Sequence, residues 1–227
     1  MSSAMLSPVL EADVPTGAAE SVADSSSFAE IMAEGLHALA QPLTILRSTV
    51  ALLASPETPE AARRRYLDLS VEQVQRACDL FEVMQDLVIA NQIEAIRAPF
   101  AISKLVAAAT DDPKIGLDAS SVRIHVLEPG DLPPALGDYA RTLQALTAAL
   151  KTAISLSPVG DRIEVRATHS GVFLRLAVSN ARAHGGTLNS SQRLALALAE
   201  ANIRSQDGSF KLAEDPFSVS MELPFAA

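Results

Sequence analysis

Apolar residues recur at heptad spacing in the first part of the chain. Ser27 and Glu30 have the spacing of a helix-capping box, and apolar residues then follow at alternating intervals of three and four positions. These residues are Leu36, Leu39, Leu43, Leu46, Val50 and Leu53. The segment Ser55-Pro-Glu-Thr-Pro-Glu60 interrupts the pattern, and a second helical run extends from about Ala61 to Asn91. The pattern therefore predicts two long helices joined by a short loop, which must lie antiparallel.

The second helical run has an apolar seam of its own. Its members are Leu67, Val71, Val74, Cys78 and Phe81, and the seam resumes at Val88. Two helices can bury each other on one side only, so a hairpin with two seams leaves apolar surface uncovered. A second copy of the chain would cover it, and we therefore predict a homodimer built on a four-helix bundle.

The pattern changes to mixed elements after Pro99. We predict helices over 101–111, 135–156 and 190–204 and strands over 122–127, 162–168, 172–179, 209–213 and 218–223, with a hairpin turn at Ser170-Gly171. Helices on one face of a mixed sheet form an α/β sandwich, so the fold class of the whole chain is α+β. The expected domains are a helical hairpin over 27–97 and a sandwich over 98–227. Residues 1–26 contain four acidic residues and no Lys or Arg, and we expect a disordered acidic tail.

Composition narrows the function classes. The net charge of -9 and the absence of a basic patch argue against a nucleic-acid partner. The single cysteine, Cys78, excludes an internal disulfide and is typical of a reducing compartment. No uninterrupted apolar run reaches the roughly 18 residues of a membrane span, and the N-terminus lacks the pattern of a secretory signal. We therefore expect a cytoplasmic protein that does not enter a membrane.

The strongest candidate for chemistry is His37 on the first helix. If Leu36 and Leu39 lie on the seam, His37 faces solvent, and Gln41 lies one turn further along the same face. Pro42 stands inside the helix, where it removes a backbone hydrogen bond at a cost of about 3 kcal/mol. An exposed imidazole is a good nucleophile toward phosphoryl groups. A solvated histidine beside a tolerated proline is the alternative interpretation of these residues.

This segment resembles the phosphoacceptor motif of bacterial sensor histidine kinases. His37, Leu39, Pro42, Leu43 and Thr44 match that motif. The segment from Asp138 to Leu146 resembles the start of the nucleotide-binding N-box of these kinases, and the order of elements agrees over residues 27–225. The resemblance implies a dimerisation hairpin carrying a phosphoaccepting His37, followed by an ATPase-type sandwich.

The departures from the kinase pattern fall on the ATP site. The two N-box asparagines that hold Mg²⁺ and phosphates correspond to Ala148 and Thr152, and Asn180 replaces the aspartate that binds adenine. The glycine pair that lets phosphate approach the last helix corresponds to Arg193 and Ala195. We therefore expect no ATP and no metal on this chain, with Mg²⁺ supplied only by a partner receiver domain.

The phosphoacceptor motif is altered as well. Ala38 replaces the acidic neighbour that acts as base during attack on ATP, and Ala40 replaces an arginine. Gln41 occupies the position where kinases that are also phosphatases orient a water.

These residues lead to ranked functional hypotheses. The first is a histidine phosphotransferase, similar to those of sporulation and cell-cycle relays, in which His37 shuttles a phosphoryl group between the aspartates of response-regulator receiver domains. The second is a pseudo-histidine kinase that binds a response regulator or a kinase without chemistry. The third is a response-regulator phosphatase that uses Gln41, and an active ATP-dependent kinase comes last.

Overall fold

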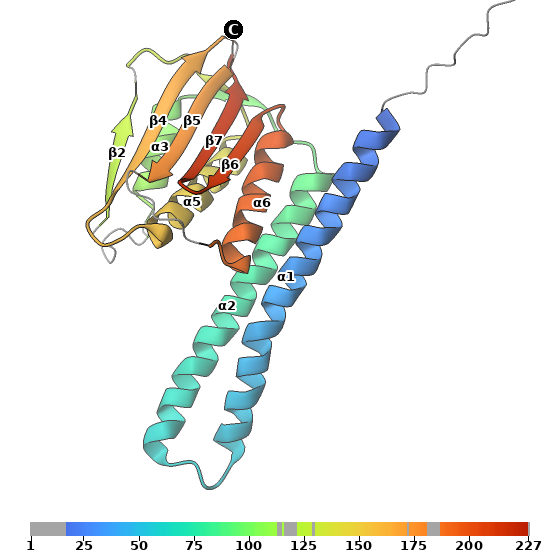
Figure 1. The fold of residues 1–227 in the computed structure, drawn as a ribbon, viewed down its shortest axis with the longest axis vertical. Coiled ribbons are helices and arrows are strands. Elements are labelled where there is room, and N and C mark those ends of the chain that lie inside the picture. The colour runs from blue at the N-terminus through green and yellow to red at the C-terminus, as the bar shows by residue number, and fades with distance from the viewer. Residues whose placement is uncertain are drawn as a thin grey trace, which may run out of the picture.

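The computed structural model describes residues 17–112, 115, 122–128, 130–171, 173–180 and 187–226. Two long helices, α1 (Gly17–Ala54) and α2 (Glu60–Gln92), form an antiparallel hairpin that extends well beyond the α/β part of the molecule (Figure 1). The bounds of α2 agree with the sequence prediction within one residue at each end.

The predicted disordered tail was wrong for residues 17–26, which are the first turns of α1. Ala18, Ala19, Glu20 and Ala23 are good helix formers, and no Gly or Pro follows Gly17 until Gly35. Ser27 consequently lies inside α1 and does not begin it. Residues 1–16 of the predicted tail lie outside the described residues.

Small and polar side chains lie between α1 and α2. Thr49 of α1 and Ser70 of α2 are both buried, and their hydroxyl oxygens are 2.9 Å apart. The heptad seams, in contrast, are not buried within one chain, because Leu36 is 58% exposed and Val71 is 70% exposed. We call the exposed apolar positions the hairpin stripe. Its members are Leu36, Leu43 and Val50 on α1, and Leu67, Val71, Val74 and Phe81 on α2.

One segment of the hairpin is apolar and long enough to cross a membrane by length and composition alone. It runs from Phe28 to Ala54, with a mean hydropathy of 1.2 and only 17% of its window buried. Its neighbour α2 lies against it and carries charged residues along most of its length, including Arg63, Asp68, Arg76 and Asp86. The apolar character of α1 is therefore explained at least as well by packing between helices as by a lipid surface.

The second part of the chain is a sandwich of one sheet and three helices. The sheet has the strand order β2-β4-β5-β7-β6, with β2 parallel to β4 and all other pairs antiparallel. Its strands are β2 (Arg123–Leu127), β4 (Arg162–Ser170), β5 (Phe173–Asn180), β6 (Ser209–Glu214) and β7 (Phe217–Pro224). The helices α3 (Ile102–Thr110), α5 (Tyr139–Leu156) and α6 (Ser190–Arg204) pack on one face of the sheet. The α+β fold class is thus confirmed.

Two short strands were missed by the sequence analysis. Ala98–Phe100 (β1) pairs antiparallel with Ala135–Gly137 (β3), so residues 135–137 are not part of the predicted helix. Helix α5 begins after Asp138, whose Oδ1 accepts a hydrogen bond from the backbone N–H of Arg141 at 3.1 Å. Aspartate is a preferred helix cap, and this signal was available in the sequence.

Helix α6 is buried on two sides, and this places the sandwich on the hairpin. Leu196 and Ile203 face the core of the sandwich. Leu194 and Leu198 belong to a second cluster with Leu80, Met84 and Leu87 of α2. Figure 1 shows α6 lying between the sheet and the hairpin. The helix that lies under the nucleotide phosphates in the family resemblance therefore serves here as the contact between domains.

Candidate functional site

His37 is exposed on α1, and Gln41 is exposed one turn further along the same helix. The helix continues through Pro42 as far as Ala54. Pro42 is itself buried, and because it has no N–H it leaves the carbonyl of Ala38 without its helical donor. The geometry therefore presents an accessible imidazole on a long helix.

The residue after His37 cannot serve as a base. Ala38 is only 5% exposed and packs in the cluster that contains Leu194 and Leu198 of α6. A carboxylate at this position would be buried among apolar side chains, at a large desolvation cost. The acidic neighbour of the kinase motif is therefore absent, and α6 covers the place it would occupy.

A polar cleft of about 290 Å³ opens beside these residues, between α1, α2 and the start of α6. Glu34, Ala38 and Gln41 line it from α1, and Arg76 lines it from α2. Leu188, Asn189, Ser190, Ser191 and Arg193 complete its wall. The sequence analysis did not anticipate that Arg76 would approach the phosphoacceptor motif, because the two residues lie on different helices and only their packing brings them together.

The two positions that hold Mg²⁺ in the kinase pattern offer little to a metal. Ala148 has no side-chain oxygen, and magnesium is bound by oxygen ligands. Thr152 is only 3% exposed, and its hydroxyl donates to the carbonyl oxygen of Ala148 at 2.9 Å.

Asn180 is fixed by its own neighbours at the end of β5. It is 6% exposed, and its Nδ2 donates to the carbonyl of Ala153 at 3.1 Å and to the hydroxyl of Ser157 at 3.0 Å. Its Oδ1 has no hydrogen-bond partner among the described residues. The residues that follow in the kinase pattern, 181–186, lie outside the described residues.

The start of α6 is closed by its own side chains. Asn189 and Gln192 form a reciprocal capping box, and Gln192 Nε2 also donates to Ser155 Oγ at 2.7 Å. Arg193 Nε donates to the carbonyl of Leu188 at 3.3 Å. A phosphate would need these backbone donors and the space of a glycine, and a long side chain stands at that position instead. The residues at Ala148, Thr152, Asn180, Arg193 and Ala195 do not fit Mg-ATP.

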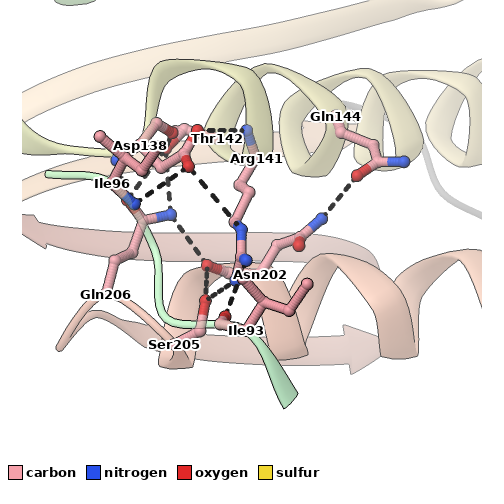
Figure 2. A network of polar contacts seen from close by, with 9 residues as sticks. All are labelled: Ile93, Ile96, Asp138, Arg141, Thr142, Gln144, Asn202, Ser205 and Gln206. Atoms are coloured by element: carbon pink, nitrogen blue, oxygen red, sulfur yellow. Dashed lines mark hydrogen bonds and ion pairs between the residues drawn. The ribbon is translucent and has the colours of Figure 1, made fainter. Parts of the chain in front are cut away.

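A polar network fastens the segment after α2 to the sandwich (Figure 2). Arg141 donates through Nη2 to the carbonyl of Ile93 at 2.8 Å and through Nη1 to Ser205 Oγ at 2.9 Å. The fully buried Gln206 accepts the backbone N–H of Asp138 at 2.7 Å. Arg97 is paired with Asp207, and this hydrogen bond holds the pKa of the Asp207 carboxyl below its usual range. These contacts link the segment after α2 to α5 and to the end of α6.

No protein-family model matches the chain, and no curated protein matches it either. Solved structures do. The Acinetobacter baumannii histidine kinase AdeS superposes with a TM-score of 0.68 at 17% identity, over 84% of this chain and 98% of that one. The chain has the fold of a sensor histidine kinase core.

Two further structures share the histidine kinase fold. The histidine kinase ThkA, solved in complex with the response regulator protein TrrA, has a TM-score of 0.64 at 15% identity, over 89% of this chain and 63% of that one. Full-length ShkA, solved in complex with AMPPNP, has a TM-score of 0.54 at 17% identity and covers 87% of this chain and 46% of its own. The sequence resemblance to sensor histidine kinases thus extends to the three-dimensional fold, with a dimerisation-type hairpin and an ATPase-like sandwich.

Proposed function

We propose that the protein is a histidine phosphotransferase of two-component signalling, which moves a phosphoryl group between receiver-domain aspartates through His37. The observation that carries this proposal is the contrast between two sites of one fold. The phosphoacceptor position keeps an exposed histidine, whereas the ATP-site positions carry side chains that do not fit Mg-ATP. A kinase fold built in this way suits a phosphoryl donor other than ATP.

The proposed chemistry needs only the imidazole from this chain. A lone pair of the neutral His37 ring attacks the phosphorus of a receiver phosphoaspartate, so that a P–N bond forms while the P–O bond to the aspartyl oxygen breaks. The carboxylate leaves with the bonding pair and is stabilised by the Mg²⁺ of the receiver. The reverse reaction delivers the phosphoryl group to a second receiver. Because an aspartyl phosphate is already activated, the loss of the acidic residue at Ala38 is tolerated better here than in attack on ATP.

The proposal includes partners and location. Response-regulator receiver domains are the substrates, and this agrees with the solved complex of the ThkA kinase with a response regulator. The hairpin stripe supports a homodimer, since seven large apolar side chains are exposed on one chain. We propose a cytoplasmic protein that binds no nucleic acid, because the net charge is -9.

The test is transfer of label from phosphorylated receiver domains of the same cell to the purified protein. The parent protein should take up label and pass it to a second receiver. His37→Ala should take up none while keeping its fold, because a surface substitution usually changes stability by no more than about 0.5 kcal/mol. His125→Ala, which removes an exposed histidine of the sheet, is the matched control and should behave like the parent. Equal labelling of His37→Ala and the parent would overturn the proposal.

A non-catalytic binding module is the second candidate function. Ala38 and Ala40 favour it, because both replace residues that kinases use in chemistry or in contacts at the phosphoacceptor. In this case the protein would bind a receiver domain or a kinase with unchanged affinity after His37→Ala, and no label would appear on the parent.

A further inference from the structure

The cleft beside the phosphoacceptor motif brings together cationic groups from two domains. Arg76 comes from the middle of α2, and Arg193 comes from the first turn of α6. The cleft adjoins His37, because it is lined by Ala38, the next residue, and by Gln41, one turn along the same helix. Figure 1 shows that the start of α6 is the part of the sandwich that reaches the middle of the hairpin.

The charges of this cleft favour an anion. Two guanidinium groups and one carboxylate, that of Glu34, line it. Neither Arg76 nor Arg193 forms an ion pair with a described carboxylate, whereas Arg97, Arg141 and Arg175 all do. The hydrogen bond of Arg193 to Leu188 uses Nε only, so its two terminal nitrogens remain available. This local excess of positive charge stands out in a chain with a net charge of -9.

The position of Arg193 explains why an arginine stands there. In the kinase pattern a glycine at this place admits the phosphates of ATP, and an arginine obstructs that approach. The same side chain lies in the wall of a cleft that opens next to the phosphoacceptor helix. Loss of the nucleotide and gain of a cation therefore follow from one residue.

We propose that Arg76 and Arg193 position the incoming receiver domain by pairing with the acidic groups that surround its phosphoaspartate. This inference rests on the proposed function. Guanidinium groups suit it because they bind carboxylates and phosphoryl oxygens through paired hydrogen bonds. Both residues are positioning residues, since they act on the approach of the receiver and His37 alone touches the reacting phosphorus. The ATPase-like sandwich thereby contributes to receiver recognition through α6.

The test is the rate of phosphoryl transfer as a function of receiver concentration. Arg193→Glu and Arg76→Glu should each raise the half-saturating receiver concentration about tenfold, because like charges across an interface are unfavourable. The rate at saturation should stay within about twofold of the parent, because neither residue takes part in the chemistry. Arg193→Lys should recover part of the loss. Arg64→Glu, an exposed arginine of α2 that does not line the cleft, is the matched control.

The outcomes separate this inference from the proposed function. If both charge reversals behave like Arg64→Glu while His37→Ala abolishes labelling, the positioning role is overturned and the phosphotransferase stands. If the parent takes up no label, titration with a beryllofluoride-activated receiver decides. Weaker binding of the two variants then upholds the role of the arginines in a binding module, and absence of binding by the parent overturns both proposals. If inorganic phosphate binds the parent and not the variants while receiver binding is equal, the cleft is a small-anion site and the inference is overturned.

Discussion

The side-chain amide of Gln144 bridges the two domains, with its Nε2 donating to Asp86 Oδ2 at 2.7 Å. Its Oε1 accepts a hydrogen bond from Asn202 Nδ2 at 2.8 Å, so one residue of α5 joins α2 and α6. Active kinases must carry ATP to the histidine, and a sandwich fastened in this way suits a protein that has no such delivery to make.

Gln144→Ala should loosen the contact between hairpin and sandwich. Loss of these hydrogen bonds should lower the free energy of unfolding by about 0.5 to 1.5 kcal/mol and should increase amide hydrogen exchange in the segment 93–97. Gln75→Ala is the matched control, because Gln75 also donates to a carboxylate, that of Asp79, but within α2 alone. Equal hydrogen exchange of 93–97 in both variants would show that Gln144 does not couple the domains.

Leu43→Glu in the hairpin stripe should weaken the proposed homodimer. A charge in an apolar interface loses its hydration without gaining a partner, so light scattering at micromolar concentration should shift from about twice the monomer mass toward the monomer. Val159→Glu, at a loop position that is 86% exposed, should leave the mass unchanged. A parent protein that is monomeric under these conditions would exclude the dimer.

Titration with Mg-ATP should give no heat up to millimolar nucleotide. The physical reason is that Ala148 offers no metal ligand, the Thr152 hydroxyl is already bonded, and Arg193 stands where phosphate must approach. A dissociation constant in the low micromolar range would contradict this prediction and would revive the kinase hypothesis.

Gln41→Ala should change the lifetime of a phosphorylated receiver mixed with the protein. An exposed amide one turn from His37 can orient a water for attack on the phosphoaspartate. If Gln41 has that role, the variant should lengthen the lifetime while His37→Ala should leave the water-dependent loss in place. Release of free phosphate is the measurement, and equal release by Gln41→Ala and the parent would exclude the phosphatase role.

Glu222→Gln should flatten the acid side of the stability profile. Hydrogen bonds from Arg175, and then from Ser209, hold the pKa of the Glu222 carboxyl below its usual range. A lowered pKa in the folded state stabilises the protein above the ordinary glutamate pKa of about 4.3, and this stability is lost as the pH falls through the folded value.

Thermal unfolding between about pH 7 and pH 3 measures this effect. The parent should lose more stability than Glu222→Gln over the acid part of that range, by about 0.5 to 1 kcal/mol for a pair that is partly open to solvent. Arg175→Ala should have the same effect, and the double variant should add nothing further, since both residues belong to one interaction. Parallel profiles for Glu222→Gln and the parent would contradict the assignment.

The sequence by itself determined the features that depend on neighbours along the chain. Helical periodicity and the Pro59 and Asn189 boundaries placed α2 and α6 within about a residue, and strand alternation placed β4, β5 and β7 closely. The phosphoacceptor motif was predictable for the same reason, because His37, Pro42 and Leu43 lie within two helical turns. The missing ATP-site residues were also visible, since a substitution is readable wherever the motif around it is.

Only the tertiary structure decided which surfaces meet. The seams of α1 and α2 proved to be exposed on one chain, because small residues such as Ala38 and polar ones such as Thr49 fill the space between the helices. The strands β1 and β3 are three residues each, too short for a period to emerge, and exist because they pair across the chain. The cleft joins Gln41, Arg76 and Arg193 from three helices. No local pattern encodes such an encounter, because it depends on how α6 packs against the hairpin.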